Sequence, residues 1–208
     1  MISLFLNTAS NFLNIVLFKE SEVLDELYLK LDRDLSKEAL FNIKKLLDKN
    51  SLSPDDISDI ICTRGPGSFT GLRVGVTISK VYSYFLNKKL YSVSTLNVMA
   101  TSTYGDIIVP LIDARRGFVY GAIYDKNYNV LMDECYLKKE DLIEKANSYG
   151  KKVVYVSNDL FEDLEVKKYE PNSLNLLKYI NKKEEDPMTF IPNYLKRTEA
   201  EENYDKRS

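Results

Sequence analysis

The first thirty residues alternate between apolar runs and short polar turns. The apolar runs are Ile2–Leu6, Phe12–Phe18 and Val23–Leu31, and the turns between them are NTASN and KESE. Runs of this length, rich in β-branched or alternating apolar side chains and bounded by polar residues, are typical of strands. The pattern predicts a meander of three antiparallel strands.

The apolar period then changes from two to about 3.6 residues. In the segment DLSKEALFNIKKLLDKN, Leu40, Ile43 and Leu47 recur at three- and four-residue spacing. This spacing predicts a helix, and Ser36 is the residue expected to cap its beginning. A short strand is predicted after it, over Ile57–Cys62.

A second helix is predicted from Leu72 to Leu86. Its apolar stripe consists of Val74, Ile78, Val81, Tyr82 and Phe85. A separate row carries a small residue at every fourth position, namely Gly71, Gly75, Ser79 and Ser83. Such a row predicts that another helix can come close, because small side chains form a groove for a neighbouring ridge. A strand over Leu90–Val93 and a short helix, capped by Ser94 or Thr95 and running toward Ser102, follow.

The second half repeats this order in shorter form after a predicted boundary at Tyr104–Asp106. Strands are predicted over Ile107–Ile112, Phe118–Tyr124, Val130–Tyr136 and Val153–Ser157, and helices over Glu140–Asn147 and Ser173–Asn181. The order of the first half, βββαβαβα, matches the ribonuclease-H-like fold of the actin, Hsp70 and sugar-kinase superfamily. We therefore expect an α/β protein of two subdomains, residues 1–104 and a shortened 105–208, with a charged tail that frays.

Composition narrows the class of protein. The chain has 208 residues, with 29 basic and 31 acidic side chains, and this balance disfavours strong direct binding to tRNA or DNA. No apolar run approaches the roughly 18 residues of a membrane span, and the N-terminus lacks the basic region of a signal peptide. Cys62 and Cys135 are expected to be buried and reduced. These features predict a cytoplasmic protein.

The absence of histidine limits the chemistry. Without this residue the Ser–His and Cys–His nucleophiles and the H-E-x-x-H zinc site are excluded. Catalysis would need carboxylates, Lys, Tyr or a metal held by oxygen atoms. We assign no catalytic residue and no metal ligand, and we expect an inactive partner protein.

A glycine-rich loop, TRGPGSFTGLRVGV from Thr63 to Val76, joins the predicted strand to the second helix. One interpretation is a phosphate cradle, because backbone N–H groups in such a loop can bind an anion. Its candidate residues are Thr8, Ser10, Gly65, Gly67, Ser68 and Thr70. The other interpretation, which we favour, is a tight turn that sets the helix against the sheet. No Lys follows the glycines as in a P-loop, and Ser68 has no glycine two residues before it, as a serine-hydrolase elbow requires.

Three segments resemble the TsaB family, also called YeaZ. They are RGPGSFTGLRVGV with the later YSVSTLNVMA, then PLIDARRGFVYGAIYD, and FIPNYLKRTEAE near the end. The resemblance implies a noncatalytic subunit that binds and activates TsaD, a larger relative that holds a metal through histidines. TsaD forms threonylcarbamoyladenosine next to the anticodon of tRNA, and the ATPase TsaE also associates.

The resemblance also implies where the partner binds. In the family, the two predicted helices form a bundle with TsaD, or with a second copy when the chain is alone. The matching apolar residues are Leu40, Ile43, Leu47, Val74, Ile78, Val81 and Tyr82. It implies contact with tRNA only through the complex and no cofactor of its own, although ATP or ADP at the complex interface stays open. The family usually has Asp where this chain has Asn7.

Two alternatives follow from the same residues. A small nucleotide-binding kinase or ATPase of the actin-like superfamily is disfavoured by the neutral Asn7 and by the short second half. A peptidase, a glycoprotease-like label used for this family, fails because no histidine is present. Arg115 and Arg116 are expected on a solvated turn. Arg73 opposes the dipole at the start of its helix, so an acidic partner or a phosphate would stabilise it.

Overall fold

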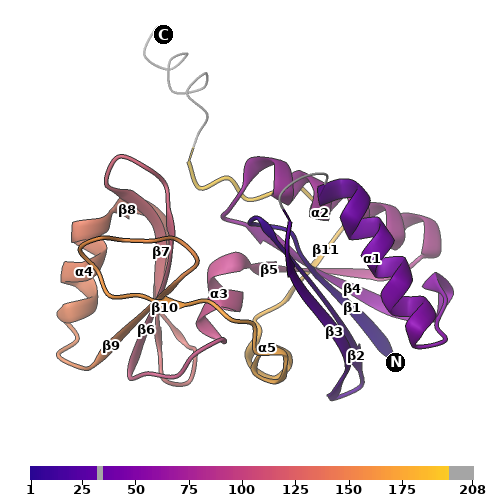
Figure 1. The fold of residues 1–208 in the computed structure, drawn as a ribbon, viewed down its shortest axis with the longest axis horizontal. Helices are drawn as coiled ribbons and strands as arrows, with labels where there is room; N and C mark the ends of the chain where they lie inside the picture. Colours follow the sequence, from indigo (N-terminus) through magenta and orange to yellow (C-terminus); the bar gives the residue numbers. More distant parts are fainter. Residues whose placement is uncertain (32–34, 197–208) are drawn as a thin grey trace, which may run out of the picture.

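The computed structural model describes residues 1–31 and 35–196, which form two β-sheets and the helices around them (Figure 1). The first sheet contains β1 (Ile2–Asn7), β2 (Phe12–Lys19), β3 (Glu22–Lys30), β4 (Ile57–Gly65), β5 (Lys89–Ser94) and β11 (Lys183–Glu185). The second sheet contains β6 (Ile107–Asp113), β7 (Phe118–Asp125), β8 (Val130–Lys138), β9 (Val153–Ser157) and β10 (Lys167–Lys168). The helices are α1 (Leu35–Lys49), α2 (Phe69–Leu86), α3 (Thr95–Ala100), α4 (Lys139–Asn147) and α5 (Ser173–Tyr179), with a 3-10 turn at Pro54–Asp56.

The two sheets share one topology. The first runs β5-β4-β1-β2-β3, and the second runs β10-β9-β6-β7-β8. In each, a three-stranded antiparallel meander is extended by parallel strands on the far side of its first strand. This arrangement confirms the predicted α/β, ribonuclease-H-like fold, with a second half that is a shortened copy of the first. The copy is shorter because no helix stands between β9 and β10, where α2 joins β4 to β5.

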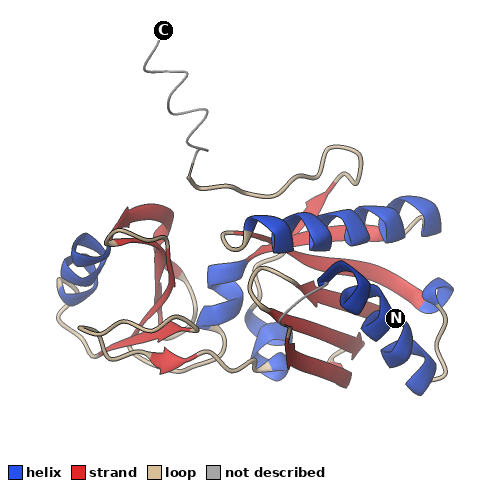
Figure 2. Cartoon of the chain, turned by 45° about the horizontal axis from the view of Figure 1, so that its top comes forward, coloured by secondary structure: helices blue, strands red, loops and turns tan. Residues whose placement is uncertain are grey.

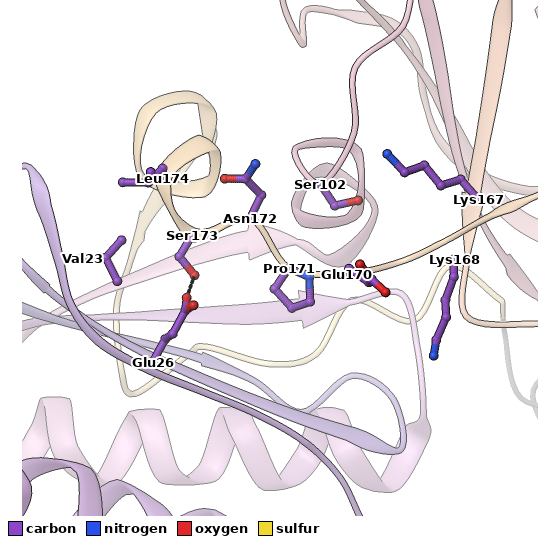
Figure 3. Close-up of a pocket in the computed structure, with 10 residues that line it drawn as sticks. All are labelled: Val23, Glu26, Ser102, Lys167, Lys168, Glu170, Pro171, Asn172, Ser173 and Leu174. Carbon is purple, nitrogen blue, oxygen red and sulfur yellow. Dashed lines mark hydrogen bonds between the residues drawn. The ribbon is translucent and has the colours of Figure 1, made fainter.

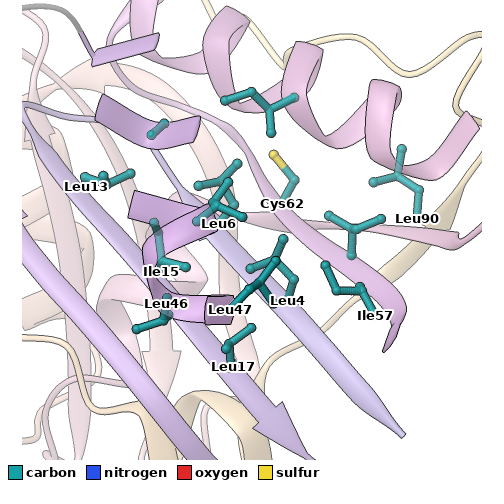
Figure 4. Close-up of a cluster of buried hydrophobic side chains, with 14 of the residues drawn as sticks. Leu4, Leu6, Leu13, Ile15, Leu17, Leu46, Leu47, Ile57, Cys62 and Leu90 are labelled. Carbon is teal, nitrogen blue, oxygen red and sulfur yellow. The ribbon is translucent and has the colours of Figure 1, made fainter. Parts of the chain in front are cut away.

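The elements stack in five layers (Figure 1). The helices α1 and α2 cover the outer face of the first sheet, α3 and α5 lie between the two sheets, and α4 covers the outer face of the second. Each helix layer follows from the strand pattern, because successive side chains of a strand point to opposite faces. In β1, Leu4 and Leu6 pack under α1 and α2 (Figure 4). Phe5, between them in the sequence, packs toward the second sheet.

Predicted and observed element boundaries differ most where a helix begins. The second helix starts at Phe69, three residues before the predicted Leu72, because the Ser68 hydroxyl accepts the Gly71 N–H at 3.3 Å and caps it. The first helix starts at Leu35, so Ser36 lies inside its first turn and is not the cap that the sequence predicted. The strands β10 and β11 were not predicted, since two or three residues carry no periodic signal.

The end of the chain returns to the first sheet. Although residues 183–185 come after the predicted boundary at residue 104, they pair antiparallel with β5 of the first sheet. Phe190 then enters the core beneath α2, where it is 2% exposed. The predicted fraying of the tail concerns residues 197–208, which lie outside the described residues. Among the described residues, no helix combines the length and hydropathy that a bilayer-spanning segment requires.

Candidate functional site

The glycine-rich loop is hydrogen-bonded to the turn that follows β1. The Ser68 N–H donates to the Ala9 carbonyl at 2.6 Å, and the Thr8 hydroxyl donates to the Gly71 carbonyl at 2.8 Å. The structure therefore brings the predicted cradle residues together. It also pairs their polar groups with one another, which takes away donors that a phosphate would need.

The glycines of this loop allow backbone to touch backbone. A Cβ on Gly67 would lie 2.3 Å from the Ala9 carbonyl oxygen, and a Cβ on Gly71 would lie 2.0 Å from that of Thr8. Gly65 has φ of +128°, and a Cβ there would meet the Asn193 carbonyl oxygen at 2.4 Å. These contacts favour the turn interpretation over the phosphate cradle, which stays a prediction.

The row of small residues on α2 faces the sheet. Gly71, Gly75, Ser79 and Ser83 are all buried, and a Cβ on Gly75 would lie 2.3 Å from the Thr8 hydroxyl oxygen. The prediction that this row receives another helix is wrong. Its small side chains instead let α2 approach β1 and β4 closely.

A small cavity lies between the two sheets, at the ends of β1 and β9. Its polar lining consists of Asn7, Ser10, Asn11, Thr95, Asn158, Asp159 and Tyr169. The cavity volume is about 60 Å³, which leaves room for a few water molecules and not for a nucleotide. The Asn7 side-chain oxygen already accepts from the Thr63 hydroxyl and from the Ala9 N–H, each at 3.0 Å. An amide thus satisfies donors at the position where the family usually has Asp.

Asp159 lines this cavity, and Asp113 lies next to it. Asp159 accepts the Asp113 N–H at 2.8 Å. Burial raises the pKa of Asp159 above its ordinary value, and the neighbouring Asp113 charge raises it further. Among residues 1–31 and 35–196, no three acidic or thiol side chains converge as a metal site. The expectation that the chain holds no metal stays a prediction.

The two cysteines differ in exposure. Cys62 is fully buried in β4 under α2, as the sequence predicted, whereas Cys135 on β8 is only half-buried. Cys135 was wrongly expected to be buried, because the outer strand of the second sheet leaves part of that side chain in solvent. Both thiols are free. Burial raises the pKa of Cys62 to about 12, so this thiol is not a nucleophile at neutral pH.

We expect a thiol reagent to modify Cys135 and spare Cys62 in the folded protein. The reason is that Cys62 is both inaccessible and protonated, and it becomes reactive only on unfolding. Burial and the neighbouring Asp133 charge also raise the pKa of Cys135, so this accessible thiol reacts more slowly than a free cysteine. Titration of free thiols at neutral pH should count one reactive thiol without denaturant and two with it. The Cys135→Ser variant is the control, and a reactive thiol remaining in its folded form would contradict the prediction.

Three residues predicted at the partner interface are in the core. Ile43, Leu47 and Ile78 are 0%, 2% and 7% exposed and pack on the outer face of the first sheet. Ile43 and Leu47 present no surface to a partner, so the structure removes them from the predicted interface, whereas Ile78 keeps a small exposed part that lines the groove between α1 and α2. Periodicity identified the apolar face of each helix correctly but could not distinguish a face on the sheet from a face on a partner.

Other apolar side chains of α1 and α2 do reach the surface. Leu40 and Val81, both predicted, are about half exposed, and Val74 and Tyr82 are partly buried at the edge of the core. Four large exposed side chains were missed, namely Phe41, Phe69, Tyr84 and Phe85. Their signal in the sequence is that α1 and α2 carry more large apolar residues than one buried face can hold.

A groove separates the two helices, which lie side by side on the first sheet (Figure 2). Its volume is about 440 Å³. The lining residues are Ser36, Leu40, Phe69, Thr70, Arg73, Val74, Thr77 and Ile78. Of the exposed side chains named above, Leu40 and Phe69 line this apolar groove, and the others lie on the same two helices. Exposed apolar side chains beside an apolar groove are typical of a protein–protein contact.

A second, open cleft lies on the other side of the first sheet, between β3, β10 and α5 (Figure 3). Its volume is about 530 Å³, and no residue predicted for the site lines it. Glu26 accepts a hydrogen bond from the Ser173 hydroxyl, and Glu170 lies between Glu26 and the two lysines Lys167 and Lys168. Acidic and basic groups share its walls, so its charge selects no ligand class.

Comparisons with known proteins show which proteins this chain is similar to in sequence and in fold. The family model described as "TsaD: tRNA N6-adenosine threonylcarbamoyltransferase" matches residues 29–168. The "tRNA threonylcarbamoyladenosine biosynthesis protein TsaB" of Bacillus subtilis is 28% identical, with 97% of this chain and 96% of that protein covered. The protein of the same name from Buchnera aphidicola is 30% identical, over 66% of this chain and 70% of that protein. The structure of YeaZ from Pseudomonas aeruginosa has a TM-score of 0.75 at 19% identity, covers 93% of this chain and 99% of its own, and shows the shared fold.

Proposed function

The chain belongs to the TsaB (YeaZ) family and carries a TsaD-type domain, and we propose that it is a noncatalytic subunit that binds and activates TsaD. Membership of this family supports a role in the biosynthesis of threonylcarbamoyladenosine in tRNA. The proposed contribution of this chain is binding energy, which holds TsaD in a competent conformation. It would do so in the cytoplasm, where tRNA is modified.

The observation that carries the proposal is the exposed apolar surface of α1 and α2. We call it the helix surface and define it by Leu40, Phe41, Phe69, Val81, Tyr84 and Phe85. Apolar side chains of this size gather in one place on a protein surface when they are covered in a complex. The groove between the helices can receive side chains from a third helix, as in ridge-into-groove packing.

The rest of the molecule offers no support for chemistry of its own. The chain has no histidine, the Cys62 thiol is buried, and the cavity between the sheets is too small for a nucleotide. The alternative of an actin-like kinase or ATPase is therefore not favoured. Hydrolysis of ATP by the isolated chain in the presence of Mg²⁺ would overturn the noncatalytic assignment.

Further contacts belong to the same proposal. TsaE would join the complex, tRNA would be reached through TsaD, and ATP or ADP would bind at the interface between subunits if at all. The helix surface would also be the contact between two copies when TsaD is absent. Each of these rests on the family resemblance.

Replacing Val81 or Phe85 by Asp is expected to abolish co-purification with TsaD of the same organism. Both side chains are exposed, at 47% and 76%, so the chain should fold normally while a charge enters an apolar contact. Loss of a contact at the centre of an interface weakens binding by roughly 30-fold or more.

Leu160→Asp is the matched control, because Leu160 is 97% exposed on a loop of the second half. This variant should bind TsaD like the wild type, and circular dichroism should show all three variants folded. Normal binding of TsaD by both helix-surface variants would show that the contact lies elsewhere.

A further inference from the structure

The helices α1 and α2 are basic, although the chain as a whole is acidic. Together they carry six basic side chains and two acidic ones, whereas the whole chain has a net charge of −2. The basic residues are Lys37, Lys44, Lys45, Lys49, Arg73 and Lys80, and the acidic residues are Glu38 and Asp48. No acidic residue lies on α2. The two helices that carry the helix surface thus have a net charge of +4, from six basic and two acidic side chains.

Part of this charge is already used within the chain. Lys44 pairs with Asp48 at 2.8 Å, and Lys49 pairs with Asp25 at 2.8 Å. The Lys80 ammonium donates to the carbonyl oxygens of Met188 and Phe190 at 3.3 and 3.2 Å. Within residues 1–31 and 35–196, Arg73 has no carboxylate within ion-pair distance.

Arg73 is held in position at the groove by two aromatic residues. Its guanidinium carbon lies 3.9 Å from the centre of the Phe69 ring, and its Nε–H donates to the Tyr194 hydroxyl at 3.1 Å. Tyr194 in turn stacks on Phe69, with ring centres 5.1 Å apart. The side chain is nevertheless exposed and lines the groove. An arginine fixed in this way loses little conformational freedom when a carboxylate binds it.

We propose that the segment of TsaD seated in this groove is an acidic amphipathic helix, one of whose carboxylates pairs with Arg73. This rests on the proposed function and names the chemistry of the partner at the same site. A helix fits because the groove runs between two helices, and its apolar face would cover Leu40 and Phe69. Acidic flanks fit because the charge around the groove is positive.

The same charge disfavours a second copy of this chain as the occupant. A symmetric dimer through the helix surface would bring two positive surfaces together, and like charges across an interface weaken it. Charge thus favours the pair with TsaD over the pair with itself. Arg73 is the residue that sets this preference, since it lines the groove near the start of α2.

Ionic strength tests the proposal in the full-length chain with full-length TsaD. Between about 50 mM and about 500 mM salt, the affinity for TsaD should fall, because salt screens attraction between opposite charges. Arg73→Gln should weaken binding about tenfold or more at low salt and should make the affinity less dependent on salt. Calorimetric titration measures both.

Arg116→Gln is the matched control, because Arg116 is an exposed arginine on the turn between β6 and β7. This variant removes the same charge and should change the affinity less than about twofold. In sedimentation experiments without TsaD, self-association of the wild type should increase with salt and should increase at low salt in Arg73→Gln.

The outcomes separate this inference from the proposed function. If TsaD binds tightly and neither salt nor Arg73→Gln changes the affinity, the proposal of an acidic helix is wrong, while TsaD remains the partner. A stable homodimer at low salt that Arg73→Gln weakens assigns the groove to a second copy and also overturns it. Absence of any binding to TsaD overturns both proposals.

Discussion

Replacing Gly71 by alanine is expected to lower the free energy of unfolding by about 3 kcal/mol. The added Cβ would stand 2.0 Å from the Thr8 carbonyl oxygen, which is a backbone atom at the end of a buried strand. Neither α2 nor the turn after β1 can move without loss of core packing, because α2 also covers the core above β1. Urea unfolding followed by circular dichroism measures the effect.

Helix propensity alone would act in the opposite direction. Gly71 lies inside α2 in the structure, and alanine inside a helix is favoured over glycine by up to about 1 kcal/mol. Gly150→Ala is the control, since Gly150 has φ of +63° and nothing within 4 Å of the added Cβ. Its cost is the backbone conformation alone, about 1 kcal/mol. A Gly71→Ala variant as stable as the wild type would show that α2 does not rest on the Thr8 turn.

Phe190→Ala is expected to cost about 4 kcal/mol of the free energy of unfolding. Phe190 is 2% exposed and fills the core under α2, far along the chain from the residues that it contacts. It also fixes the segment that follows, in which the Asn193 N–H donates to the Arg64 carbonyl at 2.7 Å and Tyr194 holds Arg73. The substitution should therefore disturb the position of Arg73 at the groove as well as the packing of the core.

Two measurements check this second result. Urea unfolding should show the loss of stability, and the amide of Asn193 should exchange its hydrogen faster than in the wild type. The adjacent Ile191→Ala is the control, because Ile191 is 69% exposed and its truncation should change stability by less than about 0.5 kcal/mol. Equal stability of the two variants would contradict the role of Phe190 as the anchor of the segment.

Both substitutions act on the packing of α2. Gly71 and Gly75 bring α2 down on the sheet, and Phe190 carries the end of the chain alongside it. Lys80, which donates to the Phe190 carbonyl, and Arg73, which donates to Tyr194, connect α2 to that end of the chain. The helix that offers the proposed partner surface is therefore positioned by residues more than one hundred positions away.

The local pattern of apolar and polar residues was sufficient to predict most helices and strands. Strands such as Val153–Ser157 and helices such as Ser173–Tyr179 appear within a few residues of their predicted limits, because period and turn residues are local properties. The exceptions depend on distant contacts. The strand β11 exists because Lys183–Glu185 pair with the edge of β5. The sequence of these three residues gives no sign of that pairing.

The candidate site was predicted less completely than the fold. The cradle residues around Ser68 and Thr8 do meet, as their motif indicated, but they bond to one another. At the helix surface, Val81 was identified and Phe85 was placed in an apolar stripe, whereas Ile43 and Ile78 were assigned to the surface although they are in the core. An apolar residue on a helix has the same periodicity whether a sheet or a partner covers it.

The sequence by itself determined the element order, the family resemblance and the absence of histidine chemistry, because each is written in residue types and their spacing. Only the tertiary structure shows what the glycine-rich segment contacts. Backbone atoms of Thr8 and Ala9 occupy the space beside Gly67 and Gly71, so these glycines serve close packing between two segments. Tertiary structure also decided which face of α2 is free. The small residues turned toward the sheet, and close approach on that side left the large side chains of Tyr84 and Phe85 in solvent.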